Sequence, residues 1–160
     1  MAAFQYRLAT LLEQRETHKQ SCEKALAERR SERRREQQVL SALTGRQEAL
    51  AEEVRSARSA PLPADATGDS WQHRASDIAL FQQRVEEAKD AVFSQQLRLE
   101  EFEQRFTEAT EALRLASQEV ETLLKHRAQA ESQFSAALER KETQEQEEIA
   151  AVLYEKRRQA

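Results

Sequence analysis

One short stretch interrupts a chain that otherwise has the composition of continuous helix. Residues 60–70 read A-P-L-P-A-D-A-T-G-D-S and contain both prolines and one of the two glycines of the protein. Because proline lacks an amide donor and restricts the residue before it, Pro61 and Pro63 together end a helix. Gly68 and Asp69 then supply turn residues and the start of a new helix. The sequence therefore predicts two long helices joined by a turn at residues 60–70.

The composition on both sides of this turn excludes a multilayered globular core. Charged residues make up 34% of the 160 residues, and the mean hydropathy is −0.86. Such a chain, rich in Ala, Glu, Gln, Arg and Leu, is typical of long helices and coiled coils. We expect an all-α fold, an antiparallel coiled-coil hairpin that forms a single domain over residues 1–160. Its first helix would span about residues 4–59, and its longer second helix about 71–158.

Apolar residues recur at alternating steps of three and four along both arms, which is the heptad pattern of a coiled-coil seam. The first arm is interrupted by charge in its middle third. Its predicted seam residues are Leu8, Leu12, Arg15, Lys19, Cys22, Leu26, Arg29, Arg33, Glu36, Leu40, Leu43, Gln47, Leu50, Val54 and Ala57. Those of the second arm are Trp71, Ile78, Phe81, Val85, Ala88, Val92, Leu99, Phe102, Phe106, Ala109, Leu113, Ala116, Val120, Leu123, Ala130, Phe134 and Ala137.

Folding the chain about residue 65 fixes which parts of the arms meet. Residues 1–60 carry 12 Lys and Arg against 9 Asp and Glu, whereas residues 61–160 carry 13 against 20, so the arms attract each other. The arginine-rich run 29–35 would lie opposite the acidic run 100–103, and its side chains could cover Phe102 and Phe106. From about residue 131 onward the second helix would have no partner in the first and form an unpaired tail.

No pattern in the sequence indicates a reaction centre, a cofactor or a metal site. The three histidines lie far apart, although His126 comes near the N-terminus in the predicted register, and no Cys and His spacing suits zinc. We therefore predict a protein that is not an enzyme and has no cofactor. Cys22 is interpreted as a small apolar seam residue. The run 29–35 is interleaved with glutamates, so we expect a self-paired face and no nucleic-acid partner. No stretch is apolar enough for direct membrane insertion.

Two segments instead indicate protein partners. Near the turn, Trp71 either anchors the turn or meets a partner, and only one of the adjacent Leu80 and Phe81 can enter the seam, which leaves the other exposed. The tail carries apolar residues between dense charge and ends in K-R-R at 156–158. These tail residues are Phe134, Leu138, Ile149, Val152, Leu153 and Tyr154. An amphipathic helix that outruns its partner is expected to bind another surface or a second copy of itself.

This arrangement resembles the FliJ/YscO family, the stalk proteins of flagellar and virulence type III secretion. The resemblance rests on a basic first helix, a short Pro/Gly/Asp turn, Trp71 just after it, the local match F-Q-Q-R-V-E at residues 81–86, and a longer acidic second helix with a basic end. In FliJ-like proteins an apolar pair at this place contacts the export-gate protein, and the matching positions are Phe81 and Val85. The high Arg, Gln and Ala content is more similar to a virulence-system member than to a flagellar one.

The resemblance implies a non-catalytic central stalk in the cytoplasm, peripheral to the inner membrane through the secretion apparatus. The end with both termini would insert into a hexameric secretion ATPase through Phe4, Leu8, Ile149, Val152 and Tyr154. The turn end, with Trp71, Phe81 and Val85, would face the export-gate membrane protein, and secretion chaperones would be further partners. The alternatives are a homodimeric coiled-coil scaffold or tether, and a stalk subunit of an F- or V-type ATPase.

Overall fold

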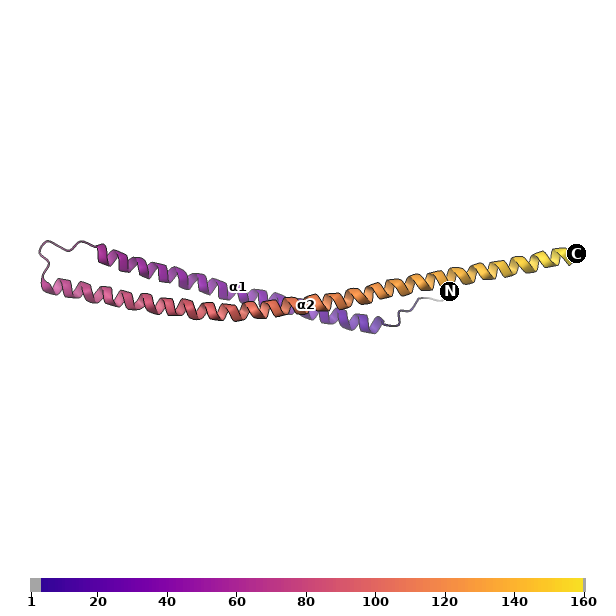
Figure 1. Cartoon of the computed structure of the whole chain (residues 1–160), viewed down its shortest axis with the longest axis horizontal. Coiled ribbons are helices and arrows are strands. Elements are labelled where there is room, and N and C mark those ends of the chain that lie inside the picture. Colours follow the sequence, from indigo (N-terminus) through magenta and orange to yellow (C-terminus); the bar gives the residue numbers. More distant parts are fainter. Residues whose placement is uncertain (1–3, 160) are drawn as a thin grey trace. The chain divides into compact units, whose positions relative to one another are not determined.

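The computed structural model describes residues 4–159 and contains two helices (Figure 1). Helix α1 spans Ala9–Ser59, with 51 residues, and helix α2 spans Gly68–Gln159, with 92 residues. No strand occurs among the described residues. The prediction of an all-α fold with a longer second helix is confirmed. Residues 1–3 and 160 of the predicted single domain lie outside the described residues.

The chain divides into two compact units, and each contains a segment of both helices. The first unit, here called the turn unit, comprises residues 24–111. The second, here called the terminal unit, comprises residues 1–23 and 112–160. In both units the α1 segment packs antiparallel against the α2 segment, which is the pairing that the heptad patterns predict.

In the turn unit the seam follows the predicted positions and is closed by a polar residue in its middle. Val54 and Leu99 are buried, and the other predicted seam residues from Leu26 to Ala109 are half-buried except Trp71, which is exposed. The heptad pattern requires one seam residue between Val92 and Leu99, and the buried Gln95 occupies that position in place of an apolar side chain. Its amide donates to the backbone carbonyl of Glu36, at 3.1 Å, and to the Glu36 carboxylate, at 2.7 Å. Because a buried amide needs such partners, this layer ties α2 to one place on α1.

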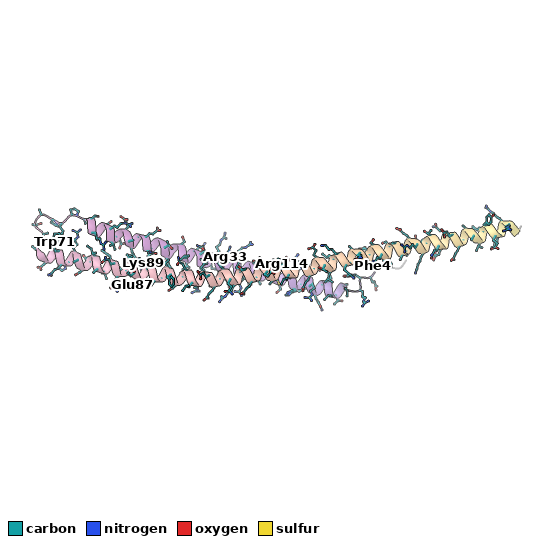
Figure 2. All side chains as sticks on the ribbon, in the orientation of Figure 1. Phe4, Arg33, Trp71, Glu87, Lys89 and Arg114 are labelled. Atoms are coloured by element: carbon teal, nitrogen blue, oxygen red, sulfur yellow. The ribbon has the colours of Figure 1, made fainter. Side chains whose placement is uncertain are left out.

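The contacts of the arginine-rich run 29–35 of α1 differ from the predicted ones. Arg29 pairs with Glu32 of the same helix, at 2.8 Å, instead of a glutamate of α2. The guanidinium of Arg33, which is labelled in Figure 2, lies 4.1 Å from the centroid of the Phe106 ring. This confirms that arginine covers this aromatic residue. Phe102 is flanked by Arg98 and Arg105 of its own helix. A residue and its i+3 or i+4 neighbour meet on a helix surface without help from tertiary structure, which favours these local pairs.

At the turn, a side chain of α2 caps the C-terminal end of α1, a contact that the sequence pattern does not predict. Four carbonyl groups at the end of a helix have no partner within it. The Arg74 guanidinium donates to two of them, those of Ala57, at 3.1 Å, and Arg58, at 2.6 Å. On the other side of the turn α2 begins at Gly68, and the Thr67 and Ser70 hydroxyl groups lie 3.2 Å apart at its start. The turn is thus stabilised by polar side chains on its α2 side.

In the terminal unit Leu12, Ala116 and Val120 are buried between the two helix segments. Arg15 extends across this seam to Glu119 with an ion pair of 3.0 Å. Helix α1 begins at Ala9, later than the predicted start near residue 4, because the preceding residues make tertiary contacts to α2 in a non-helical conformation. After Phe134 every described side chain of α2 is exposed.

Candidate functional site: exposed apolar surfaces and an N-terminal strap

The described residues form no group of His, Cys, Asp or Glu side chains that could hold a metal ion. Hydrogen bonding to Lys125 lowers the pKa of Glu121, and hydrogen bonding to Glu32 raises the pKa of Arg29. Both are ion pairs between neighbouring turns of one helix on its surface. Across residues 4–159, neither helix has a stretch long and apolar enough to cross a membrane. What the structure offers for recognition are surfaces, in both units.

On the turn unit, the residues predicted to contact a partner fall into two classes. Trp71 lies in the first turn of α2 with 58% of its side chain exposed, so it does not pack against the turn as an anchor (Figure 2). Phe81 and Val85 are half-buried in the seam, whereas Leu80, the neighbour of Phe81, is exposed. The expectation that one of the adjacent pair is exposed is met by Leu80. Trp71 and Leu80 therefore present apolar surface to solvent near the turn.

A second exposed apolar pair of the turn unit is not predicted by the heptad pattern. Phe93 is 61% exposed and Leu97 is 49% exposed. They are four residues apart on α2 and flank the buried Gln95, so they lie on the face of the helix opposite the seam. Phe93 follows the seam residue Val92, and Leu97 lies between Gln95 and Leu99. The heptad pattern places neither Phe93 nor Leu97 in the seam. Their spacing of four residues is the sequence signal that could have identified them.

On the terminal unit, residues 4–8 form a short strap across α2. The ring of Phe4, which is labelled in Figure 2, packs against the Phe134 ring at 5.6 Å between centroids. The Tyr6 hydroxyl donates to the Leu123 carbonyl at 3.1 Å, and His126 Nδ1 lies 3.0 Å from the same hydroxyl oxygen. Because that hydroxyl has one proton, Nδ1 is the donor in the second bond. The predicted approach of His126 to the N-terminal residues is confirmed.

The other residues predicted for the terminal unit separate into two groups. Phe4 and Leu8 are half-buried against α2 and belong to the strap. Ile149, Val152 and Tyr154 lie far along the tail and are 61%, 55% and 72% exposed. They occupy the stretch of α2 drawn in yellow in Figure 1, where every described side chain is exposed. The structure thus leaves the tail as an uncovered amphipathic helix.

Comparison with known proteins adds the family. The chain matches the family described as YscO-like protein over residues 3–160. No curated protein and no solved structure matches it. The match extends over both helices, the turn and the tail, and that family consists of structural components associated with type III secretion. The chain therefore belongs to the YscO-like family.

Proposed function

We propose that this protein is the non-catalytic central stalk component of a type III secretion system. Its terminal unit would contact a hexameric secretion ATPase, and its turn unit would contact the export-gate membrane protein. The observation that carries the proposal is the uncovered tail of α2, whose apolar residues have no partner in the chain. Exposed apolar residues that follow one helix face are typical of a surface that docks on another protein.

The turn unit supports the second half of the proposal through Trp71 and Leu80. Both are large apolar side chains, exposed at the start of α2. Phe81 and Val85 are half-buried, so a gate protein would meet them at the edge of the seam beside Leu80. Trp71 is the better anchor because tryptophan dominates many binding interfaces.

Membership in the YscO-like family favours a secretion apparatus over an F- or V-type ATPase as the setting of this stalk. We further propose that the protein belongs to a virulence system and acts in the cytoplasm, peripheral to the inner membrane. Secretion chaperones would bind as additional partners. The protein would couple nucleotide-driven changes in the ATPase ring to export without catalysing a reaction.

The ATPase contact can be tested with the purified chain and the secretion ATPase of the same system. We expect the chain to stimulate ATP hydrolysis and to co-migrate with the hexamer in gel filtration. Tyr154→Asp should reduce both effects severalfold, because it replaces an exposed apolar side chain of the tail with a charge. Gln144→Asp, an exposed polar position on the same tail, is the matched control and should change neither. Absence of stimulation and of co-migration for the unmodified chain would overturn the proposed function.

The gate contact needs a separate measurement with the cytoplasmic domain of the export-gate protein. Trp71→Ala should weaken binding at least tenfold, since a buried tryptophan anchor typically contributes more than 2 kcal/mol. The thermal stability should stay unchanged, because the side chain is mostly exposed. His73→Ala, two residues away and also exposed, serves as control. Equal binding by both variants would remove Trp71 from the site.

A homodimeric scaffold is the second candidate function, and the same uncovered tail favours it. A scaffold of this kind would form a stable dimer and bind no ATPase. Light scattering on the chain together with the ATPase co-migration experiment separates the two functions.

A further inference from the structure

The tail of α2, defined here as residues 138–158, is helical throughout and exposed to solvent along its whole length. All its side chains are exposed, and five of these side chains are large and apolar. These are Leu138, Ile149, Val152, Leu153 and Tyr154. An isolated helix with this much uncovered apolar surface gains stability by pairing.

Six residues of the tail lie on one stripe along the helix. Leu138, Glu142, Glu145, Ile149, Val152 and Lys156 are separated by steps of four, three, four, three and four. Side chains at such steps lie along one face of a helix. Along this face Leu138 is followed by two acidic residues, then by two apolar residues, and a basic residue comes last.

The order of charges along the stripe points to a particular occupant. We propose that the tail pairs antiparallel with the tail of a second copy of this chain. With the two-fold axis between Ala150 and Ala151, Ile149 of each copy meets Val152 of the other. Glu145 of each copy meets Lys156 of the other, and two-fold symmetry makes both contacts occur twice.

The opposite orientation is disfavoured by the same charges. In a parallel pair Glu142, Glu145 and Lys156 would each face their own copy across the seam. Like charges directly opposed at an interface are destabilising, whereas the antiparallel pair places opposite charges there. Charge order along the stripe therefore selects one orientation of the dimer.

The dimer is small, and its properties follow from that size. The tail offers about 20 residues per copy, so its interface falls in the class below roughly 1,200 Å², which forms weak and transient complexes. We expect reversible dimerisation at about 10–100 µM chain. Because exposed ion pairs flank the apolar layers, raising the ionic strength should weaken it. The inference uses only the tail and does not depend on the proposed stalk function.

The test is sedimentation velocity of the full chain carrying Cys22→Ser, which prevents disulfide dimers. At about 100 µM and low salt we expect a monomer–dimer equilibrium. Glu145→Lys and Lys156→Glu should each weaken dimerisation about tenfold or more, with helicity by circular dichroism unchanged. An equimolar mixture of the two variants should dimerise again, since positions 145 and 156 then meet with opposite charges.

Glu147→Lys is the matched control, because it makes the same charge change in the same block. Residue 147 lies two positions from Ile149, about 200° around the helix and away from the stripe. It should leave the dimer unchanged. A chain that stays monomeric throughout, a dimer that ignores both stripe variants, or an equal effect of Glu147→Lys would each overturn the proposal.

Orientation has its own readout. A spin label on Cys22→Ser, Arg140→Cys is placed near the start of the tail, on the face away from the stripe. In the antiparallel dimer the two labels are separated by roughly 30 Å along the axis, at 1.5 Å per residue. In a parallel dimer they lie side by side at the interaxial distance of about 10 Å plus the label arms. A short distance would contradict the proposed orientation.

Discussion

Arg33 and Arg74 show how single arginines complete a narrow seam. Arg33 covers the Phe106 ring, and Arg74 donates to two carbonyls at the end of α1. A guanidinium group can do both because it is planar and carries several donors in a fixed arrangement. At these two places the turn unit is held by the geometry of the charged group, which lysine would not reproduce.

Replacing Arg33 with Ala is expected to lower the free energy of unfolding by about 0.5–1 kcal/mol. The loss reflects the attraction between the cation and the Phe106 ring and the packing of the arginine stem. Urea denaturation followed by circular dichroism measures it. Arg34→Ala changes the same charge at an exposed position and should have less than half the effect. Equal losses in the two variants would show that the ring contact contributes nothing.

Replacing Arg74 with Ala should cost about 1–2 kcal/mol, because two carbonyl groups at the end of α1 lose charged donors. Arg74→Lys keeps the charge but not the paired donors, and should recover only part of the loss. Thermal unfolding of both variants provides the measurement. Full recovery by lysine would mean that charge alone, near the negative end of α1, is responsible.

At the scale of the helices, the heptad pattern predicts the seam well and its exceptions poorly. All fifteen predicted seam positions of the first arm, from Leu8 to Ala57, are buried or half-buried. On α2, Trp71 and Ala137 are exposed against prediction, because α1 has no residue beside them at either end. Gln95 was missed since a polar residue carries no apolar signal, although its side chain fills a seam position.

Two residues of α2 provide a matched test of this description. Leu99→Ala should destabilise the protein by about 2–5 kcal/mol, because the side chain is buried and its removal leaves a cavity. Phe93→Ala should change the stability by less than about 0.5 kcal/mol despite the larger truncation, since Phe93 is mostly exposed. Chemical denaturation measures both. A loss at Phe93 as large as at Leu99 would contradict the assignment of the two faces.

The strap can be tested separately from the helices. Tyr6→Phe removes the hydroxyl that joins Leu123 and His126, a loss of about 0.5–1.5 kcal/mol in local stability. Trypsin cleavage after Arg7 should then become roughly 2–10-fold faster, while the unfolding midpoint stays nearly constant. Tyr154→Phe, at an exposed position of the tail, is the control. Unchanged cleavage at Arg7 would show that the ring packing of Phe4 alone holds the strap.

At the scale of the whole molecule, the two-helix fold and the family were both accessible from the sequence. The single Pro/Gly turn defines the number of helices, and the match over residues 3–160 confirms the family. The candidate surfaces were predicted only in part. Ile149, Val152 and Tyr154 are exposed as expected, whereas Phe93 and Leu97 emerge only once burial is known. Periodicity identifies which residues share a face, but exposure also depends on where the partner helix is present.

Deleting residues 139–160 should separate the stability of the fold from the proposed contact with the secretion ATPase. The thermal midpoint of the shortened protein is expected within about 2 °C of the full chain, because the side chains of residues 139–158 are all exposed. Stimulation of the secretion ATPase should be lost with the tail. A shortened chain that still stimulates the ATPase would place the contact elsewhere in the terminal unit.

In each unit the seam consists of layers of side chains stacked in one row along the two helices, and this stacking determines how such proteins can change length. Each layer touches only the layers before and after it, as in a repeat protein, so stability adds up locally along the file. Inserting seven residues into α1 and seven into the facing part of α2 adds layers and preserves every other contact. Inserting one residue into one helix rotates all that follows by about 100° and removes it from the seam. Chains built on this plan can therefore diverge in length by whole heptads while keeping the surfaces at their ends.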